Sequence, residues 1–467
     1  MKYDLTVGLE IHVELNTQTK AFCPCKNQPF GAEPNANVCP VCLAHPGALP
    51  VISRAAIERT ITSGLAFGCE INDVIHFERK NYHYPDSPKA YQISQIVRPI
   101  CLNGGVTLKN GKFMRFNRIH LEEDAGKLIH DGVRAETMMD FNRCGVPLIE
   151  MVTEPDFSDI NDVTEFLEEV RSRLIFSSVA HCKMEEGGMR MDVNISIKPK
   201  GSKELGNRVE LKNLNSFKMV ERAIANEYAR QVSLLENGKI IATETRKWND
   251  GKGASSTMRG KETVLDYRYF ADPDQLSIRI TKNDVDILRK AMPPLAHELR
   301  EKLTKMGLTE YQAEIITREK SLTTFFFSCL DIISDEKLLT KWILNHVLSL
   351  ASNFEIGIST KQLCDIITLA QSKKISMQNS LELLEAIWGK KDSAESMAKE
   401  MNILGGVSDS ELTKIAKALI SQNEKAAKDY KDTPDKVLNF FIGQVMKQTK
   451  GMADSQRAKE IITNLLK

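Results

Sequence analysis

Residues 3–14 read Tyr-Asp-Leu-Thr-Val-Gly-Leu-Glu-Ile-His-Val-Glu, and this stretch decides the fold class. Every second residue from Tyr3 to Val13 is apolar or aromatic. Successive side chains of a β-strand point to opposite faces, so the alternation predicts a strand with one face on a core and one polar face turned toward a cavity. The residues on the polar face are Asp4, Thr6, Glu10, His12 and Glu14.

Two later segments repeat this pattern, and two others have helical period. Residues 190–195 place Arg190, Asp192 and Asn194 opposite apolar neighbours, and residues 208–212 do the same with Arg208, Glu210 and Lys212. Apolar residues recur at helical spacing over 160–174 and 217–235, and Gly238 stands where a helix C-terminus favours glycine. An antiparallel sheet with two helices between or beside its strands, an α+β domain, is therefore predicted.

The pattern of apolar residues changes at Pro293-Pro294, after which nearly all segments have helical period. A second break falls at Gly405-Gly406, and Ser408 to Glu411 fits the capping box that starts a helix. These breaks predict three domains: a sheet-rich domain over 1–292, an all-helical domain over 293–406 and a small helical tail over 407–467.

Composition narrows the class of protein. The chain has 467 residues and a formal net charge of +1, so overall charge gives no argument for a nucleic-acid partner. No apolar run has the length of a membrane span, and the N-terminus lacks the unbroken apolar core of a signal peptide. We therefore expect a cytoplasmic protein without a membrane partner, whose scattered cysteines stay reduced.

Four of the ten cysteines form two close pairs, Cys23-Pro-Cys25 and Cys39-Pro-Val-Cys42. Each pair brings two thiolates to one ion, and the connection between the pairs is long enough to close a tetrahedron. This spacing predicts a structural zinc site in a loop with few apolar residues. Free core cysteines or a redox dithiol are the alternatives, although Cys-x-Cys is an uncommon redox spacing.

Acidic residues and one imidazole form the second candidate site. Carboxylates with an imidazole are ligands for a divalent cation such as Mg²⁺, which neutralises nucleotide phosphates. Taken singly, most of these side chains are expected to be solvated surface groups, but charge in otherwise apolar strands is costly. Strand alternation alone does not place Glu123 and Glu150. The set is Glu10, His12, Glu122, Glu123, Asp124, Glu150, Glu154, Glu185, Glu186 and Asp192.

Residues 79–95 form a third, weaker candidate, because a tyrosine-rich surface loop explains them equally well. Lysine holds phosphate and tyrosine stacks on a base, which makes Lys80, Tyr82 and Lys89 candidate substrate-binding residues. The chain has no Gly-x4-Gly-Lys-[Ser/Thr] loop, no Gly-x-Ser-x-Gly elbow and no cysteine in a local nucleophile setting. Glutamine hydrolysis by this chain alone is therefore not expected.

At these same segments the chain resembles the GatB family, the B subunits of the aspartyl/glutamyl-tRNA amidotransferases. The matching motifs follow the family order over most of the first 275 residues. They are Gly8-Leu-Glu-Ile-His-Val-Glu-Leu15, Lys80-Asn-Tyr82 to Tyr91-Gln-Ile-Ser-Gln95, Leu121-Glu-Glu-Asp-Ala-Gly-Lys127, Pro147-Leu-Ile-Glu-Met-Val-Thr-Glu-Pro-Asp156, Met184-Glu-Glu-Gly187, Asp192-Val-Asn-Ile-Ser196, Glu210-Leu-Lys-Asn-Leu-Asn-Ser216, Glu244-Thr-Arg246 and Asp266-Tyr-Arg-Tyr-Phe270.

The resemblance implies an α+β cradle as the catalytic domain and a YqeY-like helical tail that binds tRNA. It implies that ATP phosphorylates the side-chain carboxylate of glutamate or aspartate on mischarged tRNA, and that ammonia then displaces phosphate. It also implies Mg²⁺ on His12, Glu123 and Glu150, with Glu10 and Asp192 beside them, and zinc on the four paired cysteines. Lys80, Tyr82, Lys89 and Lys212 are the implied substrate and ATP contacts. The implied partners are a glutaminase A subunit and a small C subunit, which complete a heterotrimer.

Four residues at three places depart from the family pattern, and none is an implied Mg²⁺ ligand. His83 stands where phenylalanine is usual, Met191 where cysteine is common, and Ala44-His45 replaces a Gly-Leu-type pair. Two other functions stay open on sequence grounds: a non-catalytic tRNA-binding scaffold and a self-contained ATP-dependent ligase. The sequence does not decide between Glu-tRNA and Asp-tRNA as the substrate.

Overall fold

The computed structural model describes residues 2–131, 135–260, 267–404, 409–431, 433–449, 453 and 455–466. The chain divides into two compact units, Met1–Ala296 and His297–Lys467. The boundary between these two units lies a few residues beyond the predicted break at Pro293-Pro294. The predicted second break at Gly405-Gly406 and the capping residue Ser408 lie outside the described residues.

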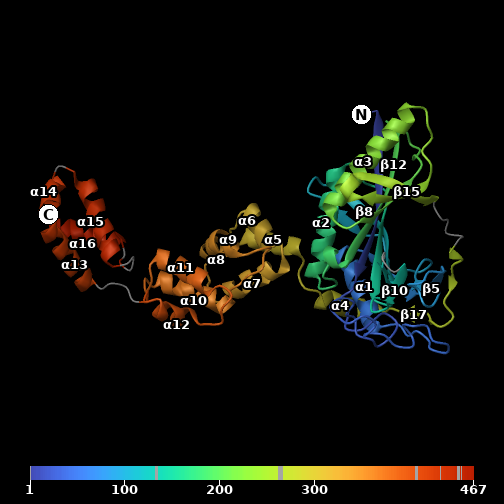
Figure 1. The fold of residues 1–467 in the computed structure, drawn as a ribbon, viewed down its shortest axis with the longest axis horizontal. Coiled ribbons are helices and arrows are strands. Elements are labelled where there is room, and N and C mark those ends of the chain that lie inside the picture. Colours follow the sequence, from blue (N-terminus) through green and yellow to red (C-terminus); the bar gives the residue numbers. More distant parts are fainter. Residues whose placement is uncertain are drawn as a thin grey trace. The chain divides into compact units, whose positions relative to one another are not determined.

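One large sheet forms the centre of the first unit (Figure 1). The strand that decided the fold class, β1 (Tyr3–Glu14), lies near its middle. Along the sheet the order is β15-β14-β13-β12-β1-β11-β8-β6-β2, with β7 paired to β8. The strand bounds are β2 (Glu70–Ile71), β6 (Cys101–Leu102), β7 (Gly105–Thr107), β8 (Phe113–Glu123), β11 (Pro147–Thr153), β12 (Met189–Pro199), β13 (Val209–Leu214), β14 (Glu244–Asn249) and β15 (Ala254–Gly260).

The pairing is antiparallel with one exception, since β13 and β14 run parallel. The predicted antiparallel arrangement is confirmed for the three strands from which it was inferred, because β12 pairs antiparallel with both β1 and β13. A parallel pair needs a long crossover connection, and α3 (Phe217–Glu236) lies in the chain between the two strands. The predicted helix over 217–235 is confirmed, and Gly238 follows it with φ +68°.

The apolar face of the sheet is buried beneath helices. On β1, Val7, Leu9, Ile11 and Val13 are at most 1% exposed, as the alternation predicted. Helix α2 (Ile160–Phe176), predicted over 160–174, and α3 lie along this side of the sheet in Figure 1, and α1 (Arg54–Ala66) packs against β8. Asp159 caps α2 by accepting from the backbone N–H of Asn161, which fixes where the helix begins.

Smaller elements complete the first unit. Next to β8, β4 (Glu78–Asn81) pairs with β5 (Tyr91–Ser94) and with β16 (Phe270–Ala271). The remaining elements are the β9–β10 hairpin (Lys127–Asp131 and Glu136–Asp140), the β3–β17 pair (Val74–Ile75 and Ile278–Arg279) and α4 (Lys282–Ala291). The three-stranded sheet brings Lys80 and Gln92 toward the polar face of the large sheet, so it positions the site.

The described residues of the second unit form helices and the turns between them, with one isolated β-bridge between Ser352 and Glu355, and they contain two separate hydrophobic cores. One core runs from Leu303 to Ile403 and the other from Leu412 to Ile462. They stand on either side of the predicted break, although the three-domain division itself stays a prediction. The helices are α5 (Ala296–Lys305), α6 (Glu310–Ile316), α7 (Lys320–Leu330), α8 (Glu336–Trp342), α9 (Leu348–Leu350), α10 (Thr360–Gln371), α11 (Met377–Ile387), α12 (Ala394–Glu400), α13 (Asp409–Gln422), α14 (Glu424–Lys428), α15 (Pro434–Gln448) and α16 (Ser455–Leu466).

In the described part of the chain, none of these helices has the length and apolar content needed to span a membrane.

Candidate active site and metal centres

The polar face of the large sheet lines a cavity of about 860 Å³. Side chains from neighbouring strands reach it because the register sets their polar positions side by side: His12 faces Glu150 across one pair and Arg190 across the other. Lys80 and Gln92 enter from the small sheet. Other lining residues are Tyr82, His83, Tyr84, Asp86, Glu122, Asp124, Asp192, Lys212, Lys247 and Tyr267.

His12, Glu122 and Glu150 form a compact cluster at this cavity. Their candidate ligand atoms all lie within 4.8 Å of one another. The Nε2 atom of His12 is 3.5 Å from Glu150 Oε2 and 3.7 Å from Glu122 Oε1. A magnesium ion with ligand distances near 2.1 Å spans about 4.2 Å between opposite ligand atoms, so these separations fit its shell. The donor set, two carboxylates and an imidazole, also suits a divalent cation.

The structure places Glu122, and not the predicted Glu123, beside His12 and Glu150. The cause is the pleat of β8, whose neighbouring residues point to opposite faces. The Glu123 carboxylate instead accepts from Lys89 Nζ at 2.7 Å and from the backbone N–H of Ile93 at 3.1 Å. Glu123 and Lys89 line a smaller adjoining cavity, so the predicted grouping of Glu123 with His12 and Glu150 is corrected.

The close contacts in the cluster shift the pKa values of His12 and Glu150. Burial alone would lower the pKa of His12, but the hydrogen bond and charge of Glu150 raise that pKa to about 9. Glu150 is 9% exposed, and although burial opposes ionisation, the neighbouring His120 and His12 imidazoles hold its pKa well below the usual range. A proton and a divalent cation therefore compete for the His12 imidazole.

A second acidic group adjoins the first across β1. Candidate ligand atoms of Glu10, Asp192 and Glu210 lie within 4.8 Å of one another. Lys212 Nζ is 2.6 Å from Asp192 and 3.3 Å from Glu210, so an ammonium already balances this group. Burial, followed by the charge of Glu150, raises the pKa of Glu10. Glu10, Asp192 and Lys212 therefore lie close together as predicted, and Glu210 lies beside them.

The predicted substrate contacts separate into two places. Lys80 and Tyr82 line the large cavity, and Lys80 Nζ lies 5.0 Å from the centre of the Tyr267 ring. Burial opposes its charge, yet Glu122 and Glu150 raise the pKa of Lys80, so this lysine stays cationic. Lys89 is paired with Glu123 in the smaller cavity. Sequence reasoning missed His120 and Lys247; the alternation Ile119, Leu121 on β8 could have indicated that His120 shares a face with Glu122.

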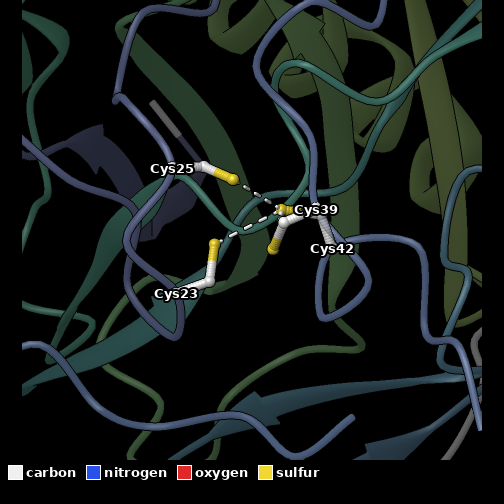
Figure 2. A group of neighbouring side chains, drawn as sticks. All are labelled: Cys23, Cys25, Cys39 and Cys42. Carbon is white, nitrogen blue, oxygen red and sulfur yellow. Dashed lines mark hydrogen bonds between the residues drawn. The ribbon is translucent and has the colours of Figure 1, made fainter.

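The four paired cysteines come together as the spacing predicted, with their sulfur atoms directed toward one another (Figure 2). Cys42 Sγ lies 3.3 Å from Cys23 Sγ and 3.7 Å from those of Cys25 and Cys39. A tetrahedral zinc with Zn–S bonds of about 2.3 Å separates its sulfurs by about 3.8 Å, so the four thiols fit this ion. The thiol of Cys23 and the charge of Lys20 lower the pKa of Cys42 to about 4, against the effect of burial.

The cysteine loop is held to the rest of the domain by hydrogen bonds rather than by an apolar core of its own. The Asn37 backbone N–H donates to the Asn142 side chain at 2.8 Å, and Lys20 Nζ donates to the Phe141 carbonyl at 3.2 Å. Cys144 Sγ contacts the Cys42 carbonyl at 3.5 Å. Loss of the metal is therefore expected to loosen this long loop.

Comparison with known proteins assigns the chain to a family. The model of the GatB/GatE catalytic domain matches residues 5–286, which include the sheet, the cavity and the cysteine loop. The chain belongs to the GatB family. A second model, a GatB domain of the YqeY type, matches residues 324–466. This second match begins well before Gly406. The YqeY-type region is therefore longer than the tail after Gly406 that the resemblance indicated.

GatB proteins from several bacteria resemble the chain over its full length. The B subunit of the aspartyl/glutamyl-tRNA(Asn/Gln) amidotransferase of Caldicellulosiruptor bescii is 41% identical, over 99% of this chain and 98% of that protein. The B subunit of the same enzyme from Thermoanaerobacter pseudethanolicus is 41% identical over 99% of each chain. That of Persephonella marina is 39% identical over 100% of each.

Cys39→Ser is expected to remove bound zinc and lower the melting temperature, because three thiolates cannot close the tetrahedral site. Elemental analysis of the pure wild-type chain should find about one zinc per molecule. Cys364→Ser, which changes a buried cysteine of the helical unit, serves as the matched control and should keep the zinc. Metal-free protein with unchanged thermal stability would contradict a structural zinc site.

Proposed function

We propose that this chain uses ATP to phosphorylate the side-chain carboxylate of glutamate or aspartate on mischarged tRNA, and directs ammonia onto the activated carbonyl. The product is Gln-tRNA or Asn-tRNA. The observation that carries the proposal is the cluster of His12, Glu122 and Glu150, two of which line one cavity with Lys80 and Lys212, within a GatB catalytic domain. An ATP-dependent ligase of the GatB type needs cation ligands and phosphate-binding cations at one place, and this cavity offers both.

Each group has a proposed role. His12, Glu122 and Glu150 hold Mg²⁺, which supplies charge neutralisation for the triphosphate when bound. Lys80 and Lys212 bind phosphate oxygens, and Tyr82 borders the nucleotide. Asp192 orients Lys212 by accepting from it at 2.6 Å, and Glu10, which accepts from Asn194 at 2.9 Å, adds negative charge beside this lysine. The zinc on Cys23, Cys25, Cys39 and Cys42 is structural, because four protein ligands leave no open position.

The chemistry requires the phosphoryl step. A carboxylate resists attack by ammonia because an oxide would have to leave, whereas phosphate leaves readily from an acyl phosphate. Such an intermediate has to be kept from water until ammonia attacks it. The relatives are named as B subunits, which supports a complex with further subunits; we propose a glutaminase A subunit as the ammonia source and a small C subunit, together in the cytoplasm.

The function is tested by ATP hydrolysis that depends on mischarged tRNA, measured with the purified complex. Hydrolysis should rise severalfold with Glu-tRNA(Gln) or Asp-tRNA(Asn) and remain basal with correctly charged tRNA. Comparison of the two mischarged species identifies the substrate. A non-catalytic tRNA-binding scaffold predicts tRNA binding without any stimulated hydrolysis, and that outcome would overturn the proposed activity.

We further propose that the helical tail over 407–467 binds tRNA. It has its own hydrophobic core, and exposed Lys425, Lys428 and Lys447 lie on α14 and α15. Deleting the tail is expected to raise the apparent KM for mischarged tRNA and to weaken the salt dependence of binding, since fewer phosphate contacts release fewer counterions. The variant Lys425→Ala/Lys428→Ala should shift both quantities in the same direction by a smaller amount. An unchanged KM after deletion would assign the tail another role.

A further inference from the structure

His120 is a buried imidazole at the cation cluster to which neither the sequence motifs nor the proposed function gives a role. It lies on β8, two residues before Glu122 and therefore on the same face, and it stands opposite Glu150 in the register with β11. Its residue is 2% exposed. Its Nε2 atom is 3.6 Å from Glu150 Oε2 and 3.7 Å from Glu122 Oε2.

The two carboxylates therefore have one imidazole on each side. His12 stands at nearly the same distances, 3.5 Å from Glu150 and 3.7 Å from Glu122, but it lines the cavity. His120 is enclosed by protein. Both rings thus touch the same pair of carboxylates, His12 from the cavity and His120 from a buried position on the neighbouring strand.

The other ring nitrogen of His120 indicates what the ring does. Nδ1 is buried and has no hydrogen-bond partner among the described residues. A buried N–H without an acceptor is rare in proteins, whereas an unused acceptor is tolerated more often. The lone pair is therefore at Nδ1 and the hydrogen at Nε2, where it faces the two carboxylates. A histidine that binds a metal through Nε2 donates its Nδ1–H to a partner. Nδ1 of His120 has no such partner among the described residues, which disfavours His120 as a metal ligand.

We propose that His120 is a positioning residue, whose Nε2–H holds the Glu122 and Glu150 carboxylates in the orientation in which they and His12 bind the divalent cation. At 3.6 and 3.7 Å the contacts are loose, and they are expected to shorten when the carboxylates turn toward a bound ion. The inference rests on the proposed cation site, and groups behind metal ligands commonly change metal affinity by about 10–100-fold.

The test is a titration of the purified full-length chain with Mn²⁺, in which electron paramagnetic resonance measures the free ion. His120→Phe removes the N–H donor while keeping a ring, and it should weaken Mn²⁺ binding by about tenfold or more. His120→Gln carries an amide N–H at a similar reach and should recover most of the affinity. His130→Phe is the matched control, because His130 is exposed on the β9–β10 hairpin, and it should bind Mn²⁺ as the wild type does.

A second readout separates positioning from general structural support. For tRNA-dependent ATP hydrolysis by the whole complex, His120→Phe should raise the Mg²⁺ concentration at half-maximal rate and leave the rate at saturating Mg²⁺ nearly unchanged. A structural defect would instead lower the melting temperature and resist rescue by Mg²⁺ or by glutamine at this position. His120→Leu replaces His120→Phe if the phenyl variant does not fold.

The outcomes also separate this inference from the proposed function. Wild-type affinity for Mn²⁺ in both His120→Phe and His120→Leu would overturn the role of His120 and leave the cation site standing. Equal weakening by His120→Gln and His120→Phe would overturn the donor role as well. A wild-type chain that binds no Mn²⁺ would overturn the cation site and, with it, this inference.

Discussion

Glu122→Gln should lower tRNA-dependent ATP hydrolysis by on the order of 100-fold or more, because it removes a charge that holds the cation beside the transferring phosphoryl group. The amide keeps the shape of the side chain, so folding should be retained. The measurement is phosphate release by the complex with mischarged tRNA, accompanied by Mn²⁺ binding to the isolated chain. The melting temperature gives the control for folding.

The neighbouring residue supplies the matched comparison. Glu123→Gln makes the same chemical change one position along β8, but its carboxylate faces Lys89 and not His12. It should leave Mn²⁺ affinity near the wild-type value, whereas the family motif assigned the cation to Glu123. Loss of Mn²⁺ binding in Glu123→Gln with normal binding in Glu122→Gln would reverse our assignment.

The second large effect concerns the source of nitrogen. The isolated chain should amidate mischarged tRNA with ammonium and ATP but not with glutamine, since glutamine hydrolysis needs an activated nucleophile. None of the ten cysteines forms a disulfide: four form the candidate zinc site, and the other six are buried. Burial raises the pKa of each of these six, to about 12 for Cys69, Cys144 and Cys182, which keeps them as unreactive thiols.

Product formation with each nitrogen donor, before and after addition of a glutaminase partner, is the measurement. Glutamine use by the lone chain would overturn the need for a partner and would favour a self-contained ligase. With the whole complex, ¹⁵N-amide glutamine and excess unlabelled ammonium test whether ammonia travels by an enclosed route. Label well above the bulk ratio supports such a route, and label diluted to the bulk ratio excludes it.

Much of the first domain could be predicted because one residue pattern dominates it. The alternation in β1 indicated both the buried apolar face and the polar face with Glu10 and His12, and the helices that begin at Ile160 and Phe217 followed from their periodicity. The parallel pairing of β13 and β14 could not be predicted, because strand direction depends on the path of α3 and leaves no mark in either strand.

The candidate sites were predicted unequally for a related reason. The spacing of Cys23, Cys25, Cys39 and Cys42 fixes their convergence, which is confirmed, while the zinc itself stays a prediction. The acidic run from Glu122 to Asp124 has no apolar residues to set its phase. The motif alone therefore left the two glutamates indistinguishable, whereas the preceding alternation of Ile119 and Leu121 and the pairing of β8 with β11 separate them.

The alternating pleat of β8 makes chain length, as well as residue type, a requirement for activity. Inserting or deleting one residue between His120 and Glu122 would turn Glu122 away from His12 and bring the wrong neighbour to the cation, even though the composition of the segment barely changes. An engineer who wishes to shorten or extend this protein should therefore edit in pairs within the strand or confine single-residue edits to the turns. Substitution libraries that keep the length fixed will sample function here, whereas libraries with single-codon insertions or deletions will mostly sample inactive proteins.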